Sequence, residues 1–266
     1  METSLIFHQG QTLPHFAAFV LLETEEGCAE LIRYHEHYLK VARREGAGFI
    51  LDTATWRANP DWGRLLGYDL DGLKAINTIA VEHVAALRAK WETGMGPLVL
   101  NGAVGPRGDG YQAGCMGAAE AEDYHVIQIA AFAATQADMV TAYTMTNIDE
   151  AVGIARAARA HTMPCAISFT VETDGRLVTG KTLREAIETV DEETDGYAAY
   201  FMINCAHPTH FEQSLAAGAT WVERIHGVRA NASTKSHAEL DEADTLDEGD
   251  PADLGRNYEA VIRVNS

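Results

Sequence analysis

Cys205 has the most specific chemical potential in this chain, because of where it lies. It follows the mostly apolar run Tyr200–Asn204 and is followed closely by His207 and Pro208. An apolar run that ends in a polar, proline-bounded turn is typical of a buried strand whose last side chains face a cleft. A lone free cysteine is usually a small buried hydrophobe, but a thiolate is also a nucleophile and a metal ligand. The position therefore predicts that Cys205 takes part in chemistry.

The same pattern, an apolar run followed by polar residues, occurs five more times along the chain. In barrels of alternating strands and helices, the loops that follow the strands share one rim, and this rim carries the active site. We therefore expect the polar side chains of these loops to converge with Cys205. The candidate substrate-binding residues are Asp52, Thr55, Trp56, Arg107, Asp109, Thr144, Glu172, Asn204 and Asn231.

Several of these candidates also have a purely structural interpretation. Arg107 can bind a substrate carboxylate through two parallel hydrogen bonds, or it can pair with Asp109 and stiffen a glycine-rich loop. Asp52 can cap local amides at a strand end. Glu172 lies in Glu-Thr-Asp-Gly, a sequence that is typical of a turn. Both interpretations stay open at the level of the sequence.

Helical patterns lie between the apolar runs. Apolar residues recur at three- and four-residue steps, and Gly46 and Gly94 stop the first two patterns. The predicted strands begin near Phe49, Leu98, Met139, Cys165, Ala199 and Trp221, and the predicted helices cover 31–41, 73–91, 119–135, 148–161, 182–190, 208–217 and 251–262. This repeated alternation indicates parallel strands with helical crossovers.

Such a chain forms either an open, doubly wound sheet or a closed barrel. No Gly-x-Gly-x-x-Gly follows a strand and no phosphate loop with Gly-Lys-Ser/Thr occurs, so a nucleotide-binding sheet loses its main support. We therefore predict a (β/α)8 TIM barrel, formed as a single domain by residues 1–266. The sequence shows six strands, so the barrel is expected to be incomplete, with the first and last strands missing or partial.

The composition restricts the partners and the compartment. There are 20 basic and 39 acidic residues, and the formal charge of -19 repels nucleic acids and anionic membranes. Cys28, Cys115, Cys165 and Cys205 are widely spaced, so neither disulfides nor a zinc knuckle is implied. The acidic stretch 241–250 is expected to be a solvated loop and helix start. Without a signal pattern or a long apolar run, we expect a cytoplasmic protein.

Three segments resemble the homocysteine S-methyltransferase family, and the likeness extends over nearly the whole chain. They are Trp56-Arg57-Ala58-Asn59-Pro60-Asp61-Trp62-Gly63, the loop Gly105–Tyr111, and above all Ile203-Asn204-Cys205-Ala206-His207-Pro208. The resemblance implies a (β/α)8 enzyme of methionine biosynthesis that moves a methyl group from a sulfonium or ammonium donor to the thiol of homocysteine. It also implies zinc as cofactor, with Cys205 as the first zinc-ligating cysteine.

The resemblance also suggests how the site works. A zinc ion bound by cysteine sulfurs ionises an incoming thiol and orients it, so catalysis rests on positioning. Trp56 and Tyr111 would wall a donor pocket by cation–π contact with a sulfonium, or else pack over the barrel mouth. Asn231 corresponds to an asparagine that is common in the rim loop of the family, or else it stabilises its own loop.

The chain departs from the family pattern at three places. The second and third zinc cysteines lie in a Gly-Gly-Cys-Cys motif on the last strand, and no such motif occurs before Ser266. The opening Asp-Gly-Gly, which helps to bind the amino acid, would precede Glu2. At Tyr143, many relatives carry a glutamate that holds the amino group of homocysteine.

Three functions therefore remain open for the sequence. The first is a zinc-assisted methyltransferase that takes small-molecule substrates, homocysteine and a methyl donor, and binds neither nucleic acid nor membranes. The second is an inactive barrel that acts as a binding module, or as a homo-oligomer formed through unpaired strand edges. The third is a metal-free lyase that uses Asp52 or Glu172 as base.

Overall fold

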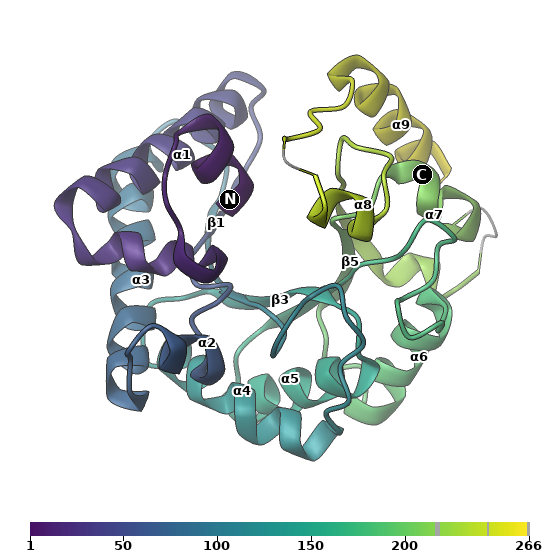
Figure 1. The fold of residues 1–266 in the computed structure, drawn as a ribbon, viewed down its shortest axis with the longest axis horizontal. Helices are drawn as coiled ribbons and strands as arrows, with labels where there is room; N and C mark the ends of the chain where they lie inside the picture. Colours follow the sequence, from purple (N-terminus) through teal and green to yellow (C-terminus); the bar gives the residue numbers. More distant parts are fainter. Residues whose placement is uncertain (216–218, 244, 265–266) are drawn as a thin grey trace.

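The computed structural model describes residues 1–215, 219–243 and 245–264. Within these residues, six parallel strands form one sheet in the order in which they occur along the chain. They are β1 (Phe49–Asp52), β2 (Leu98–Val104), β3 (Met139–Met145), β4 (Cys165–Phe169), β5 (Tyr200–Asn204) and β6 (Ile225–Arg229). The sheet curls into an arc, so its strands end around a common centre (Figure 1).

Helices cover the outer face of this arc and connect successive strands (Figure 1). Most begin at a residue whose side chain accepts a backbone N–H, as at Thr24, Asn59, Asp69 and Thr182, which satisfies a free donor of the first turn. The α-helices are α1 (Glu25–Arg44), α2 (Pro60–Leu65), α3 (Leu70–Trp91), α4 (Ala118–Ala133), α5 (Ile148–Ala160), α6 (Leu183–Thr194), α7 (Pro208–Leu215), α8 (His237–Asp241) and α9 (Pro251–Val264).

The main apolar core lies between the sheet and the helices. Phe169 of β4 and Phe201 of β5 are fully buried there, and their rings stack with centroids 6.1 Å apart. The neighbouring residues Ser168 and Asn204 point to the inside of the arc, because successive side chains of a strand face opposite sides. The two-residue period thus separates an apolar outer layer from a polar interior.

The first 24 residues form short helical turns that pack against α1 and α3. These turns are Ser4–His8, Pro14–Phe16 and Ala18–Glu23. Leu5 and Phe19 are fully buried in a second apolar cluster, together with residues of the two helices such as Leu31 and Ile76. This packing brings residues 1–4 to the inside of the arc.

Strands β1 and β6 are the two edges of the sheet and do not pair with each other. A side-chain contact joins them where both strands end. Arg229, the last residue of β6, donates from Nη1 to Oδ2 of Asp52, the last residue of β1, at 2.7 Å. Within the described residues, the arc is therefore bridged at this end by an ion pair and not by backbone hydrogen bonds.

The predicted alternation is confirmed as an α/β fold of six parallel strands, which is consistent with an incomplete TIM barrel. The closed eight-stranded form and the single-domain assignment stay predictions. Helices α2 and α8 have six and five residues, which is too short to show a helical period in the sequence. Residues 216 and 217 of the predicted helix 208–217, and residue 244 of the acidic stretch, lie outside the described residues.

The predicted start of the sixth strand, near Trp221, is wrong. Trp221 and Val222 are buried around a 3₁₀ turn, Val222–Arg224, and the strand begins at Ile225. Arg224 holds this turn against the neighbouring elements, because its guanidinium donates to both carboxylate oxygens of Asp191 in α6 at 2.8 and 2.9 Å. The buried apolar pair therefore belongs to the turn before the strand.

No described helix has both the length and the apolar composition that are needed to cross a membrane.

One half-buried titratable side chain of α3, His83, gives a prediction about stability. Burial, and to a smaller extent the nearby charge of His35, lowers the pKa of His83 to about 4. Between pH 6.5 and about 4 the unfolded chain therefore binds a proton that the folded chain does not. The free energy of unfolding consequently decreases as the pH is lowered through this window. Replacing His83 by Gln should remove on the order of 1 to 3 kcal/mol of this fall, measured by urea unfolding at several pH values.

The matched control is His161→Gln, since His161 is exposed. An unchanged pH dependence in the His83→Gln variant would contradict the assignment of this titration to His83.

Candidate active site

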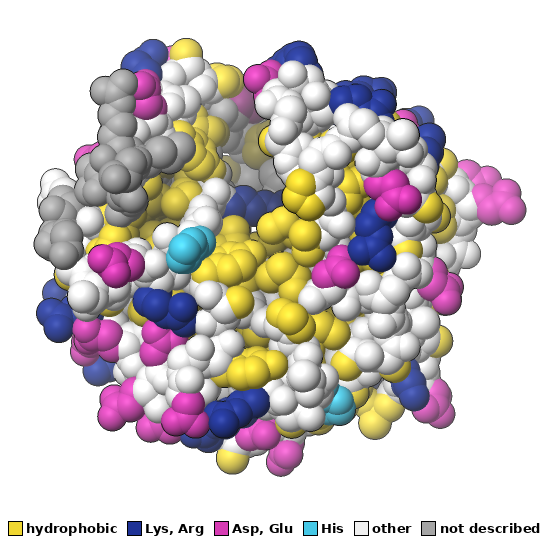
Figure 2. Space-filling model, turned by 180° about the vertical axis from the view of Figure 1, so that it is seen from behind, with side chains coloured by type: hydrophobic (Ala, Val, Ile, Leu, Met, Phe, Trp, Pro, Cys, Tyr) yellow, Lys and Arg dark blue, Asp and Glu magenta, His cyan; other side chains and the backbone are white. Residues whose placement is uncertain are grey.

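The carboxyl ends of the strands surround a cavity of about 330 Å³. Seen from behind, the molecule is hollowed at its centre, and atoms of basic side chains lie deep in the hollow (Figure 2). Strands β1, β2, β3, β5 and β6 and the N-terminal segment all contribute to the wall. The lining residues are Met1, Glu2, Thr3, Ser4, Phe16, Tyr34, Tyr38, Asp52, Thr53, Trp56, Ala103, Tyr111, Tyr143, Thr144, Asn204, Cys205, Arg229, Ala230 and Asn231.

Cys205 lies in the wall of this cavity directly after β5. Its backbone has a φ of 57°, and Thr144, which follows the centre of β3, has a φ of 64°. Both values lie in the left-handed region, which is strained for residues other than glycine and costs of order 1–3 kcal/mol. The structure therefore holds two cavity residues in conformations that the chain does not favour by itself.

The side-chain amide of Asn204 holds both strained residues. Its Oδ1 accepts from the backbone N of Thr144 at 3.0 Å and from Oγ of Ser168 at 2.6 Å. Its Nδ2 donates to Oγ1 of Thr144 at 2.9 Å and to Sγ of Cys205 at 3.1 Å. One buried amide thus joins β3, β4 and β5 and orients the sulfur.

His237, at the start of α8, fixes the backbone of Cys205 from the other side. Its Nε2 lies 2.8 Å from the carbonyl oxygen of Cys205, and its Nδ1 lies 3.1 Å from Oε1 of Glu172. The ring of Tyr111 packs on the imidazole with centroids 4.2 Å apart. Burial, and then the charge of the adjacent Cys205, raises the pKa of Tyr111 well above its usual value, so its hydroxyl stays protonated.

Asp52 and Arg229 form the charged part of the cavity. Asp52 Oδ1 accepts from Nδ2 of Asn101 at 2.7 Å and from the hydroxyl of Tyr143 at 3.1 Å, while Oδ2 accepts from Arg229. Burial, and then the charge of Asp52, raises the pKa of Tyr143, which therefore remains a donor. Burial alone would lower the pKa of Arg229, but the charges of Asp52, Tyr143, Tyr34 and Cys205 together raise it well above its usual value, so the guanidinium stays charged.

Six of the ten residues that the sequence singles out meet in this cavity. These are Asp52, Trp56, Thr144, Asn204, Cys205 and Asn231. Asn231 donates from its amide to the carbonyl of Cys205 at 3.0 Å, and Trp56 donates from its indole to the carbonyl of Tyr143 at 3.4 Å. Their roles in binding a substrate stay predictions, since position alone does not establish a role.

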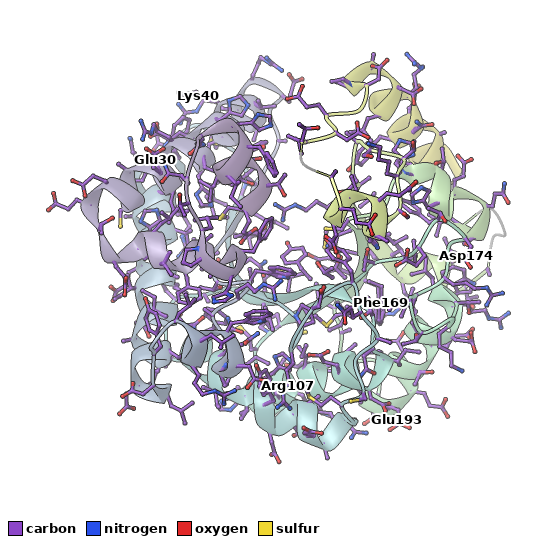
Figure 3. The ribbon with its side chains drawn as sticks, in the orientation of Figure 1. Glu30, Lys40, Arg107, Phe169, Asp174 and Glu193 are labelled. Carbon is purple, nitrogen blue, oxygen red and sulfur yellow. The ribbon has the colours of Figure 1, made fainter. Side chains whose placement is uncertain are left out.

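The other four predicted residues lie outside the cavity wall. Thr55 is buried and donates to the carbonyl of Ala103, and Glu172 contacts His237. Asp109 accepts from the backbone N of Tyr111 at 2.9 Å. Arg107 lies beside α4, outside the central opening (Figure 3).

The possible pairing of Arg107 with Asp109 is not what the structure shows. The guanidinium of Arg107 instead donates to Asp61 at 2.6 Å and to Glu120 at 2.8 Å. These two carboxylates lie in α2 and α4, so Arg107 ties its loop to the neighbouring helices.

Sequence reasoning missed three residues with a prominent place in the site. Arg229 was assigned to a loop after a strand, although it ends β6 and enters the cavity. His237 lies on a helix that the sequence does not predict. Glu2 lines the cavity from the N-terminal segment, where the sequence shows no pattern. The alternation Ile225, Gly227, Arg229 was the available signal for Arg229, once the strand is placed correctly.

The described residues do not fit the zinc ion that the resemblance implies. A catalytic zinc site takes three protein ligands and one open position. Among residues 1–215, 219–243 and 245–264, no group of three or more His, Cys, Asp or Glu side chains is arranged to hold a metal ion. The sulfur of Cys205 itself accepts a hydrogen bond from Asn204 at 3.1 Å.

The fold is an α/β arc of six parallel strands that is consistent with an incomplete barrel, and its cavity lies at the carboxyl ends of the strands. The sequence profile of the family described as Homocysteine S-methyltransferase matches residues 1–259. The chain belongs to the homocysteine S-methyltransferase family. No curated protein sequence matches the chain.

Solved structures of the homocysteine methyltransferase MmuM from Escherichia coli have a similar fold. The metallated form has a TM-score of 0.71 at 20% identity, and the oxidized form has a TM-score of 0.72 at 24% identity. In both cases the match covers 98% of this chain and 86% of the other. The apo form has a TM-score of 0.59 at 22% identity, and this match covers 100% of this chain and 93% of the other. At these identities the likeness establishes the fold.

The contacts of His237 predict that it controls access to the thiol. Replacing His237 by Ala removes the hydrogen bond to the Cys205 carbonyl and the ring that supports Tyr111. A buried hydrogen bond contributes about 1 kcal/mol, so the alkylation rate of Cys205 by iodoacetamide should rise on the order of fivefold. The rate is measured by mass spectrometry of the Cys205 peptide.

His226→Ala is the control, because His226 is exposed on β6. Equal alkylation rates in the wild type and the His237→Ala variant would show that His237 does not hold this wall of the cavity.

Proposed function

We propose that the chain transfers a methyl group from a sulfonium or ammonium donor to the thiol of homocysteine. The observation that carries the proposal is the cavity at the strand ends, in which a chain of this family gathers a thiol, aromatic rings and carboxylates. Pockets with a few convergent polar groups at this end of a barrel are the usual place of catalysis.

The wall of the cavity suits a cationic methyl donor. Aromatic faces attract sulfonium and quaternary ammonium groups, and carboxylates add to this attraction. The aromatic residues in the wall are Phe16, Tyr34, Tyr38, Trp56, Tyr111 and Tyr143, and the carboxylate in the wall that is not bonded to Arg229 is Glu2. One face of Trp56 is covered by the guanidinium of Arg57 at 4.7 Å, which leaves the other rings as the better donor contacts.

The proposed reaction depends on the positioning of the two reactants more than on proton transfer by the protein. The acceptor thiolate attacks the methyl carbon in line, a new S–CH₃ bond forms, and the bond to the donor sulfur or nitrogen breaks with its electron pair. The departing sulfur or nitrogen loses its positive charge, and the thiol proton goes to solvent. In this chain, Asn204, Tyr111 and His237 would fix the wall against which the two reactants meet, and the aromatic rings would exclude water.

The resemblance assigns Cys205 to zinc, although no group of three metal ligands is arranged around it among the described residues, so this assignment is tested separately from the reaction. Replacing Cys205 by Ser should remove whatever zinc copurifies with the wild-type chain, because the serine hydroxyl is a much poorer ligand for zinc than a thiolate. Zinc is measured by inductively coupled plasma mass spectrometry on protein purified without chelators. Cys115→Ser is the control, since Cys115 is an exposed free cysteine. Equal zinc content in the two variants would refute the role of Cys205.

An activity assay tests the function directly. The full chain is incubated with homocysteine and, in turn, S-methylmethionine, betaine or S-adenosylmethionine, and methionine is quantified by mass spectrometry. We expect methionine with at least one donor, and we expect Asn204→Ala to lower kcat/KM roughly 10- to 100-fold because the sulfur and Thr144 lose their common support. Asn257→Ala on α9 is the matched control.

The absence of methionine with all three donors, with and without added zinc, would rule out these donors and count against the proposed reaction. An Asn204→Ala variant as active as the wild type would leave the function standing and reject the role of Asn204.

A binding or self-association role is the second candidate, and one observation favours it. A second cavity lies where β5 and β6 begin, beside the edge strand β1, and is lined by Ile50, Ala199, Tyr200, Met202, His226 and Gly227. Ile50 is 40% exposed there, and hydrophobic side chains surround the hollow on this face (Figure 2). Sedimentation velocity over a range of protein concentrations decides whether copies of the chain associate.

The metal-free lyase is less well supported. A general base needs a free oxygen within reach of the substrate. Both oxygens of Asp52 accept hydrogen bonds, and Glu172 is turned toward His237 outside the cavity wall.

A further inference from the structure

The ion pair with Asp52 uses only part of the hydrogen-bonding capacity of Arg229. A guanidinium carries five N–H donors in one plane. Nη1 donates to Asp52, and no second acceptor among the described residues is bonded to the group. The side chain lines the cavity and is 44% exposed, whereas that of Asp52 is 15% exposed. Donors of a fixed cation therefore face the space that a ligand would fill.

Asp52 is in the opposite state, because its acceptor positions are already occupied. Its Oδ1 receives the amide of Asn101 and the hydroxyl of Tyr143, and its Oδ2 receives Arg229. Tyr143 also lies within 3.3 Å of Oδ2. An ammonium group would have to displace a charged or buried donor to reach this carboxylate, which is unfavourable. Asp52 is therefore built to hold the guanidinium in place.

The distance between Arg229 and the sulfur is set by the sheet. Asn204 and Arg229 are directly paired across β5 and β6, and the backbone N of Cys205 donates to the carbonyl of Arg229 at 3.1 Å. The sulfur and the guanidinium thus enter one cavity from adjacent backbone positions. A thiol and a carboxylate that are separated by a few carbons match this arrangement.

We propose that Arg229 anchors the carboxylate of the acceptor, so that the cavity selects thiols that carry a carboxylate. Asp52, held by Tyr143 and Asn101, positions the guanidinium and does not bind the amino group. Arginine suits this task because its fork matches the two oxygens of a carboxylate. This inference rests on the proposed function for the identity of the thiol, and it names the contact that selects it.

Three thiols separate the contributions of the amino group and the carboxylate of homocysteine. L-homocysteine carries both groups, 4-mercaptobutyrate lacks the amino group, and 3-mercaptopropylamine lacks the carboxylate. Isothermal titration calorimetry of the full chain under reducing conditions is expected to show binding of the two thiols that carry a carboxylate. The affinity for 3-mercaptopropylamine is expected to be lower by roughly tenfold or more. Equal binding of all three thiols would overturn the proposal.

The variant Arg229→Gln should weaken both carboxylate thiols roughly 10- to 100-fold and leave 3-mercaptopropylamine unchanged. Arg229→Lys keeps the charge but loses the fork, so an intermediate loss is expected. The matched control is Arg159→Gln, because Arg159 pairs with Asp195 on the outer surface. If Arg229→Gln does not fold, the Arg229→Lys variant and the selectivity of the wild type among the three thiols still test whether Arg229 anchors the carboxylate.

The outcomes distinguish this inference from the proposed function. Equal binding of homocysteine to the wild type and to Arg229→Gln would reject Arg229 as the anchor but leave homocysteine as the proposed acceptor. A loss of binding in Arg107→Gln instead would assign the carboxylate contact to Arg107. Binding of 4-mercaptobutyrate that depends on Arg229, without any methionine formation, would support the carboxylate anchor and reject homocysteine methylation. If no thiol binds, both proposals fall.

Discussion

The contact between Asp52 and Arg229 joins the two edges of the sheet at the place where the cavity opens. The strands on either side of the gap share no backbone hydrogen bonds, so the side chains of their last residues determine how the arc is held at this end. An ion pair between exposed groups is worth little, but this pair is braced by Asn101 and Tyr143 from β2 and β3. Four strands therefore meet in one charged network, and the site depends on it.

The neutral half of the site is organised by amide and imidazole groups. Asn204 draws β3 and β5 together and keeps Thr144 and Cys205 in left-handed conformations. The loop after β2 is fixed at a second point, since one oxygen of Glu150 accepts from the backbone N of Arg107 at 2.7 Å and contacts Nε2 of His125 at 2.8 Å. Because such buried polar networks are costly when incomplete, each of them favours one arrangement of the cavity wall.

Much of the fold could be predicted from the sequence, because apolar runs and helical periods report burial directly. The error at Trp221 shows the limit, since a buried apolar pair packs as well in a turn as in a strand. The site was predictable where residues directly follow a strand, as Cys205 and Asn231 do. Arg107 and Glu172 follow strands too, but helices that the sequence does not predict, α2 and α8, supply their partners. Partners that are distant in sequence decide which polar side chain reaches the cavity.

The charges in the cavity also explain how one site can serve reactants of opposite charge. An unpaired Arg229 would repel a sulfonium or ammonium donor, whereas an unpaired Asp52 would repel the carboxylate of an acceptor. Paired at 2.7 Å, the two groups nearly cancel at a distance while each keeps its direction at short range. The unused donors of Arg229 then remain attractive to a carboxylate in contact, and the aromatic rings and Glu2 remain attractive to a cation. Under the proposed reaction, the pair that bridges the strand edges would thus allow one cavity to hold both an anionic acceptor group and a cationic donor.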